Sequence, residues 1–204
     1  VSYYSDGTED TRRTYVFDTN SNMIEYTLYM DNEFRRSIKY EYDSNSNKIK
    51  QISYNQDGSQ GVWVEFSYDS NNNAIERTVY DADGVIDRRE TIKYNSNNDW
   101  TEWIYLSTWS TSYRYTNEYD DNFNRIKYVR YNYDTGEIMS SVEWQYDTNN
   151  NNIQTIGYNS SGLQSYKKTY EYDSLNRKIK ESSFDESNNP EYFITFEYDS
   201  NNNL

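Results

Sequence analysis

The sequence predicts an all-β protein, a long antiparallel meander of about 16 strands made of tandem repeats of about 26 residues. Three observations predict it. An aromatic residue followed by Asp or Asn recurs along the chain, two turn signals separate successive copies, and apolar and polar residues alternate between the turns. Because an open sheet of this many strands twists, we expect a curved or spiralling single-layer sheet.

Each repeat is marked by an anchor, the aromatic residue directly before Asp or Asn. The hexamer YDSNNN occurs at residues 68–73 and again at 198–203. An Ile follows most anchors by seven positions, and a second aromatic residue follows most of them by twelve. The period runs from end to end, so we expect one continuous array over residues 1–204. The anchors are Phe17, Tyr42, Tyr68, Tyr94, Tyr119, Tyr146, Tyr172 and Tyr198.

The first turn of each repeat follows the anchor and has sequences such as DSNNN at residues 69–73. An Asp side chain accepts hydrogen bonds from backbone N–H groups two residues on, and Asn tolerates the left-handed conformation. We therefore interpret the Asp residues as turn closers and expect no metal site. Calcium at the Asp turns is the alternative, but no loop has the oxygen ligands of an EF-hand.

The second turn of most repeats ends in Gly, as at Gly58, Gly84, Gly136 and Gly162. Glycine supplies the positive φ that a hairpin tip requires. Residues between the turns alternate strictly, as in IKYEY at 38–42 and VEFSY at 64–68, which predicts strands with two different faces.

We expect one face to carry an aromatic stripe and the other to be polar. The stripe combines the anchor column with the column two residues before it: Tyr15/Phe17, Tyr40/Tyr42, Phe66/Tyr68, Trp144/Tyr146, Tyr170/Tyr172 and Phe196/Tyr198. The polar face carries Lys39, Glu41, Glu65, Glu118, Glu143, Glu171 and Glu197. The face of the second aromatic column, which includes Tyr54, depends on hairpin register and stays open.

The composition excludes several classes of function. The chain has no Cys and no His, so disulfides, thiolate metal sites and the usual catalytic triads are excluded. A net charge of −14 disfavours nucleic acid and anionic lipid, and no apolar run is long enough for membrane insertion. A pair from the Glu column would suit a two-carboxylate glycosidase. Such a column is more typical of a solvated face, so we expect no enzyme and no cofactor.

The fourth repeat departs from the pattern because Trp and Tyr gather in it. We expect Trp109 to lie exposed at a loop tip, in the slot of Gly58 and Gly84. Ordinary repeat drift is the alternative, with Trp100 as a substitute for the repeat Ile and Trp103 in the column of Ile52 and Val129. The candidate ligand-binding residues are Trp100, Trp103, Trp109, Tyr113 and Tyr115. Exposed aromatic rings near Ser and Thr suit a carbohydrate or protein ligand.

The anchor pattern resembles the YD repeats of the RHS family. YDSNSNKI at 42–49, YDSNNNAI at 68–75, YDTNNNNI at 146–153 and YDSLNRKI at 172–179 match it. The turn glycine of that family is replaced here by Ser46, Asn72, Asn150 and Asn176. The resemblance covers essentially the whole chain and implies a secreted or cell-surface β-repeat array with a scaffolding or adhesion role. Carbohydrate binding is often associated with such repeats.

These observations lead to an expected function. The first hypothesis is a non-enzymatic extracellular or cell-surface scaffold, part of a larger protein. The alternative is a carbohydrate- or protein-binding module that uses the aromatic cluster of the fourth repeat. A chain made of hairpins presents edge strands, so we also expect self-association or continuation of a longer repeat array.

Overall fold

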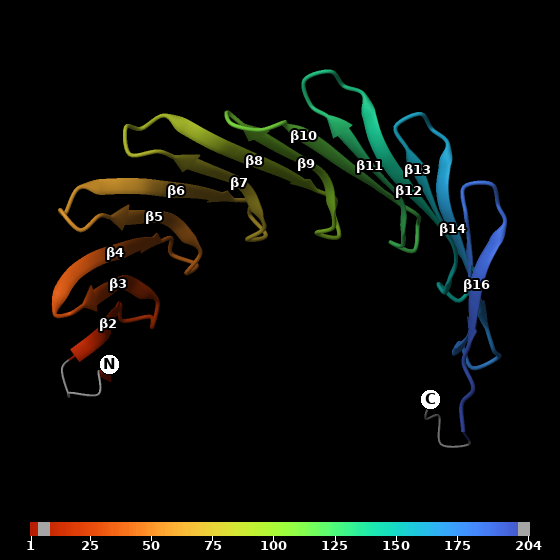
Figure 1. Cartoon of the computed structure of the whole chain (residues 1–204), viewed down its shortest axis with the longest axis horizontal. Helices are drawn as coiled ribbons and strands as arrows, with labels where there is room; N and C mark the ends of the chain where they lie inside the picture. Colours follow the sequence, from red (N-terminus) through yellow and green to blue (C-terminus); the bar gives the residue numbers. More distant parts are fainter. Residues whose placement is uncertain (4–8, 200–204) are drawn as a thin grey trace. The chain divides into compact units, whose positions relative to one another are not determined.

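The computed structural model describes residues 1–3 and 9–199. These residues form sixteen strands and no helix, and the strands are hydrogen-bonded neighbours in their sequence order (Figure 1). Every pairing that the structure describes is antiparallel, from β2 with β3 to β15 with β16. The all-β meander that the sequence predicts is confirmed. Residues 200–203 of the second hexamer copy lie outside the described residues.

The chain divides into two compact units. One comprises residues 1–93 and 105–110, and the other comprises residues 94–104 and 111–204. The first holds β1 (Ser2–Tyr3), β2 (Glu9–Phe17), β3 (Met23–Met30), β4 (Glu33–Tyr42), β5 (Lys48–Tyr54), β6 (Gln60–Tyr68), β7 (Ala74–Tyr80) and nearly all of β8 (Ile86–Tyr94). The second holds β10 (Tyr113–Tyr119), β11 (Arg125–Asn132), β12 (Ile138–Tyr146), β13 (Asn152–Asn159), β14 (Gln164–Tyr172), β15 (Lys178–Phe184) and β16 (Pro190–Thr195). Strand β9 (Trp100–Ser107) contributes residues to both.

The Asp of each first turn closes the hairpin as predicted. In the turn from β6 to β7, Asp69 Oδ1 accepts the N–H groups of Asn71 at 2.8 Å and Asn73 at 2.9 Å. Asp69 Oδ2 accepts the side-chain amide of Asn73 at 3.0 Å. Asn72 lies between them with a φ of 64°. Ser46, Asn150 and Asn176 occupy the same turn position and have φ values of 64°, 64° and 60°. Asn adopts this left-handed conformation at low cost.

The anchor Tyr joins each repeat to the one before it. The Tyr68 hydroxyl donates to the carbonyl oxygen of Lys48 at 2.9 Å, beside the bulge that ends the pairing of β4 with β5. The same bond recurs at Tyr42, Tyr119, Tyr146, Tyr172 and Tyr198, over distances of 2.8–3.1 Å. Burial raises the pKa of Tyr68, which keeps the hydroxyl protonated as a donor. The Tyr-Asp pair thus combines a link between repeats with a turn closer.

Cross-strand register fixes the two faces. Tyr40 lies opposite Gln51, and Gln51 lies opposite Val64, so Tyr40, Tyr42, Phe66 and Tyr68 share one face, here called the Tyr face. Glu41 lies opposite Lys50, and Lys50 lies opposite Glu65, which defines the Glu face. The aromatic stripe is therefore confirmed, and a lysine lies within it. The Lys48 ammonium is 5.5 Å from the Tyr40 ring and 5.1 Å from the Phe66 ring.

The Glu face is not simply polar, which corrects the expectation. Tyr54 lies opposite Ser37 on this face, and Trp63 stacks on Tyr80 with ring centroids 4.9 Å apart. The second aromatic column therefore belongs to the Glu face, where salt bridges such as Lys50 with Glu65 at 3.0 Å surround it. Sequence alternation missed this because the bulge after each first turn shifts the pairing by one residue.

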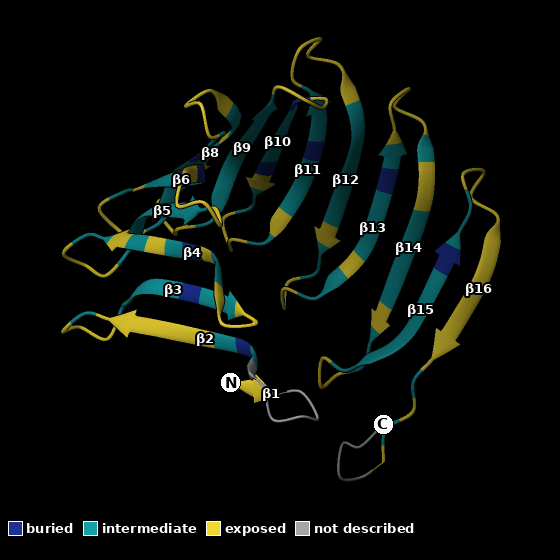
Figure 2. Ribbon diagram, turned by 60° about the vertical axis from the view of Figure 1, so that its left-hand side comes forward, coloured by how far each residue is buried: buried dark blue, intermediate teal, exposed yellow. Residues whose placement is uncertain are grey.

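Burial is shallow on both faces. The buried apolar residues described are Val64, Val79 and Val129, and no described side chain falls below 2% exposure. Phe66 and Tyr68 are half-buried, while Tyr15 and Phe17 are more than half exposed. Within each unit, the strands contact their sequence neighbours in a single layer, as strands β11 to β16 show in Figure 2. An aromatic stripe on a single layer has no second layer to bury it.

Candidate functional site

The turn between β9 and β10 places Trp109 in solvent. Its side chain is 84% exposed, so the predicted exposure is confirmed. The prediction that Trp109 takes the position of Gly58 and Gly84 is wrong. Those glycines have positive φ and Trp109 does not, and the hydrogen bonds of this turn differ from those of the other second turns. Thr108 donates its N–H to the Asp87 carbonyl at 3.1 Å, and Trp109 donates its N–H to the Ser107 hydroxyl at 3.2 Å.

A depression of about 260 Å³ lies beside this turn in the first unit. Its lining combines the apolar side chains of Ile86 and Leu106 with Arg88 and Arg89. Both arginines are already paired, since Arg89 Nη2 lies 2.9 Å from Glu76 and Arg88 Nε lies 3.5 Å from Glu90. The turn therefore offers an exposed indole beside a small apolar hollow.

The other four predicted residues belong to the second unit, where three of them lie in ring contact. Trp103 stacks on Tyr115 with centroids 5.0 Å apart, and Tyr113 contacts Tyr115 at 6.0 Å. All of these rings are half-buried. Trp109 is in the first unit and is described apart from them.

Tyr128 on β11 completes the cluster, and sequence reasoning missed it. Its ring stacks on Tyr115 at 6.1 Å and meets Trp100 edge-on at 6.5 Å. Tyr128 lies opposite Asn117, so the signal that would have found it is the cross-strand register of the hairpin. Burial raises the pKa of Tyr128. We call Trp100, Trp103, Tyr113, Tyr115 and Tyr128 the aromatic cluster.

Two predicted placements within the cluster are wrong. Trp100 does not replace the repeat Ile, because its carbonyl accepts the Tyr119 hydroxyl at 3.0 Å, as the Lys48 carbonyl accepts that of Tyr68. Trp100 therefore takes the position of Lys48, one residue before that of Ile49. Trp103 does not share a column with Val129, because Val129 lies opposite Thr116 whereas Trp103 stacks on the neighbouring Tyr115. Tyr115 and Thr116 point to opposite faces of β10.

Two buried polar atoms at the cluster have no hydrogen-bond partner: Trp103 Nε1 within it, and Oδ1 of Asn117, which lies opposite Tyr128. Asn117 is 5% exposed, and its amide donates to the Trp100 carbonyl at 3.1 Å and to the Tyr119 hydroxyl at 3.2 Å. A buried polar atom without a partner destabilises the fold unless a bound group satisfies it. The cluster thus combines ring faces with one unused donor and one unused acceptor.

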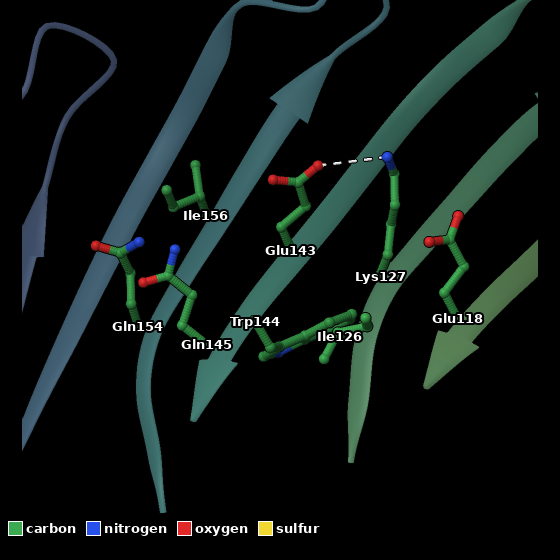
Figure 3. Close-up of a pocket in the computed structure, with 8 residues that line it drawn as sticks. All are labelled: Glu118, Ile126, Lys127, Glu143, Trp144, Gln145, Gln154 and Ile156. Carbon is green, nitrogen blue, oxygen red and sulfur yellow. Dashed lines mark ion pairs between the residues drawn. The ribbon is translucent and has the colours of Figure 1, made fainter. Parts of the chain in front are cut away.

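A second depression, of about 230 Å³, lies over β10, β11, β12 and β13 (Figure 3). Glu118 and Glu143 project from the strands on either side of Lys127, and the Lys127 ammonium lies 3.5 Å from Glu143. Gln145 and Gln154 add side-chain amides to the lining. This is where the Glu column comes nearest to the carboxylate pair of a glycosidase. Lys127 lies between the two carboxylates, so the three side chains form a row of alternating charges on a solvent-exposed face of the sheet.

The described residues contain no group of three or more acidic side chains placed to hold a metal ion. At every described Asp turn, the carboxylate instead accepts backbone N–H groups of its own loop. The part of the chain that the structure describes also contains no helix long and apolar enough to cross a membrane.

One family model matches the chain, described as a protein of unknown function (DUF2963), over residues 35–80. That match covers less than half of the sequence. No curated protein matches the chain.

Several solved structures are similar. A TcdB2-TccC3 structure without its hypervariable C-terminal region has a TM-score of 0.48 at 11% identity, over 90% of this chain and 12% of that one. A porin-like protein from Bacteroides uniformis has a TM-score of 0.39 at 12% identity, over 85% and 82%. A protein of unknown function from Bacteroides fragilis has a TM-score of 0.16 at 11% identity, over 95% and 96%. All three TM-scores lie below 0.5, so the function proposed below rests on the residues of this chain.

Proposed function

We propose that this chain is a non-enzymatic repeat scaffold, a segment of a larger secreted or cell-surface protein. One observation carries the proposal: the repeated polar residues are committed to holding hairpins together. Each anchor hydroxyl described above donates to a carbonyl of the preceding repeat, and the closing Asp carboxylates accept N–H groups of their own loops. A pattern whose repeated polar groups close hairpins and join neighbouring repeats supports a structural role for the repeat.

An enzyme assay tests this proposal. The chain is incubated with a panel of oligosaccharides and polysaccharides, and products are separated by chromatography. We expect no turnover, because Lys127 is paired with Glu143 between the two candidate carboxylates. Hydrolysis that disappears in both Glu118→Gln and Glu143→Gln would show a glycosidase and overturn the scaffold proposal.

The second candidate function is a carbohydrate- or protein-binding module. It is favoured by the exposed indole of Trp109 and by the aromatic cluster with its unused donor and acceptor. Ring faces stack on sugar rings, and polar atoms fix their hydroxyl groups. A glycan array probed with the wild type, Trp109→Ala and Trp103→Phe tests it. Trp103→Phe keeps a ring and removes the unused N–H donor. Glycan binding that both variants retain, or no binding by the wild type, would reject these residues as a carbohydrate site.

A further inference from the structure

The two faces of the sheet carry different charge in strands β10 to β15 of the second unit. Cross-strand register assigns each charged residue of these strands to a face. The Glu face carries four basic and three acidic residues: Arg114, Lys127, Lys167 and Lys180, with Glu118, Glu143 and Glu171. The Tyr face carries four basic residues and one acidic residue: Arg125, Arg130, Lys168 and Lys178, with Glu181. In a chain of net charge −14, the Tyr face is therefore cationic.

The acidic residues of this part of the chain gather in the turns instead. Between β10 and β15, the turns contain six acidic residues and one basic residue: Asp120, Asp121, Asp134, Glu137, Asp147 and Asp173, with Arg177. Arg177 is itself paired with Asp173 at 2.6 Å. Strands of this length extend over roughly 25 Å. The Tyr face is thus a cationic band between acidic turns, and the net charge of the whole chain does not describe it.

Two arginines of β11 are held against aromatic rings on this face. The guanidinium carbon of Arg130 lies 4.1 Å from the Tyr113 ring centroid, and that of Arg125 lies 4.4 Å from the Trp144 ring centroid. A ring at this distance attracts the cation and restricts its movement. None of the ion pairs described in this unit involves either arginine. Since the N–H groups of a guanidinium form a rigid fork that matches a carboxylate, each arginine is a preorganised partner for one.

A lysine of this face also lies beside rings. The Lys178 ammonium is 5.4 Å from the Tyr170 ring and 4.8 Å from the Phe196 ring. Lys168 and Lys178 share one acidic partner, Glu181, at 3.0 Å each. One carboxylate therefore serves two lysines, and the face keeps a positive charge when its described ion pairs are taken into account.

Aromatic rings lie on the surface among these cations. Tyr115 of the aromatic cluster lies opposite Arg130, so the cluster shares the face with the arginines. In β14, the Tyr166 ring lies over the backbone of Gly157, where a Cβ would clash with it. Tyr166 is 37% exposed and is two residues from Lys168. A ring laid on the sheet beside a cation suits a ligand that has both an apolar face and an anionic group.

We propose that the Tyr face of the second unit binds a linear polysaccharide of uronic acids, which lies across strands β10 to β15. The proposal rests on the second candidate function, carbohydrate binding, and names its ligand class. Carboxylates of the sugars pair with Arg125 and Arg130, and Tyr166 stacks on a sugar ring. Equivalent positions of neighbouring repeats lie about 9.6 Å apart, which is two strand spacings. This is similar to the length of a disaccharide, so a polymer with a carboxylate on every sugar presents one to each repeat.

A sugar chain suits this face better than other polyanions do. Nucleic acid has a high charge density, which the acidic turns on both sides of the face repel. An acidic peptide matches the charges but brings no sugar ring to Tyr166. Both remain as outcomes of the test.

Isothermal titration calorimetry of the 204-residue chain with two polymers tests the ligand class. Polygalacturonate carries a carboxylate on every sugar, and its fully methyl-esterified form has the same backbone without the charge. At pH 7 and about 0.1 M salt, we expect the chain to bind the first polymer and not the second. Binding should weaken as the salt concentration approaches about 1 M, because the ion pairs are then screened.

Strand β11 supplies matched variants, since Arg125 and Lys127 lie on its opposite faces. Arg125→Gln removes a positive charge from the Tyr face and should weaken polygalacturonate binding by about fivefold, the upper value for an exposed ion pair. Lys127→Gln makes the same change of net charge on the Glu face and should bind like the wild type. Tyr166→Ala should weaken binding as well. Arg125 is exposed, so circular dichroism should show Arg125→Gln to be folded.

The outcomes separate this proposal from the function on which it rests. Equal binding of both polymers, or binding of neither by a chain that binds a neutral glycan, would overturn the uronic acid proposal and leave carbohydrate binding standing. A chain that binds no glycan at all would remove both. Equal losses in Arg125→Gln and Lys127→Gln would show that the Tyr face is not the site. Polyglutamate or polyuridylate bound as tightly as polygalacturonate would indicate an acidic peptide or a nucleic acid as the partner and would also overturn the proposal.

Discussion

The first and second turns of the repeat differ in how uniform their conformation is from one repeat to the next. Seven described first turns, after the anchors from Phe17 to Tyr172, share the same backbone hydrogen bonds. Four second turns, those starting at Asn55, Asp81, Asn159 and Asp185, have this same loop geometry. The other three differ. Asp31 and Asn32 form a tight turn with positive φ, Asn132 to Glu137 form a longer loop, and the third contains Trp109.

The contacts of each turn with its neighbours explain this difference. Five of these first turns follow a Tyr whose hydroxyl bonds to the preceding repeat, namely Tyr42, Tyr68, Tyr119, Tyr146 and Tyr172. Several first turns also bond directly to the next one. Asn47 Nδ2 donates to Asn72 Oδ1 at 2.9 Å, Asn124 to Asn150 at 2.9 Å, and Asn151 to Asn176 at 3.0 Å. Second turns contact neighbouring repeats through other groups. Gln164 donates to Asn188 at 3.2 Å, and in the three irregular turns the N–H groups of Asp31, Thr108 and Tyr133 donate to the carbonyls of Asp10, Asp87 and Ser112. The first turns share one kind of contact between repeats and one conformation, whereas the contacts of the second turns differ from turn to turn, as their conformations do.

The largest expected effect is acid destabilisation, since it acts on many first turns together. The side-chain amide of the Asn four residues on, with its backbone N–H, lowers the pKa of Asp18, Asp43, Asp69, Asp120 and Asp147, and Arg177 does the same for Asp173. A lowered folded-state pKa contributes stability above the unfolded value of 3.8 and loses it as pH falls through the folded value. Urea midpoints should hold from pH 7 to 5 and fall steeply below about pH 4.

Asp69→Asn provides the control for that experiment. It keeps the oxygen that accepts the N–H groups of Asn71 and Asn73, as Asn95 does naturally in the fourth repeat, and removes the titrating carboxylate. This variant should be less stable at pH 7 but should lose less between pH 5 and 3 than the wild type. Equal losses in both proteins would show that the turn carboxylates are not the acid-sensitive groups.

The second prediction compares the hydroxyl of an anchor with that of a Tyr near a second turn. Tyr68→Phe leaves the Lys48 carbonyl without its donor and should lower the free energy of unfolding by about 0.5–1.5 kcal/mol. Tyr133→Phe, in the loop between β11 and β12, should change it by less than about 0.5 kcal/mol because that side chain is 43% exposed. Equal losses in denaturant melts would contradict the special role of the anchor hydroxyl.

The same comparison explains what the sequence could predict. The period, the strands and the Asp turns could be predicted because each depends on residues close together in the chain. The face on which Tyr54 lies could not be predicted, because the bulge beside Ile49 shifts the pairing register without changing the alternation of apolar and polar residues in the sequence. Tyr128 was missed for the same reason, because it joins the aromatic cluster through pairing with Asn117. The conformation at Trp109 was misjudged because the position in the repeat predicts where a turn lies but not its conformation, which differs among the second turns.

The smallest expected effect on stability is that of Trp109→Ala. The indole is 84% exposed and has no ring contact or side-chain hydrogen bond among those described, so its removal should change the free energy of unfolding by less than about 0.5 kcal/mol. Trp63→Ala is the matched change at a tryptophan that stacks on Tyr80. It should cost more, since stacked aromatic pairs contribute about 0.5–1.5 kcal/mol beyond the area they bury. Denaturant melts of both variants make the comparison. If Trp109→Ala cost as much as Trp63→Ala, the Trp109 turn would hold the sheet together as the first turns do. If Trp109→Ala leaves the free energy of unfolding unchanged, the indole does not stabilise the fold, and its exposed surface is available to a ligand.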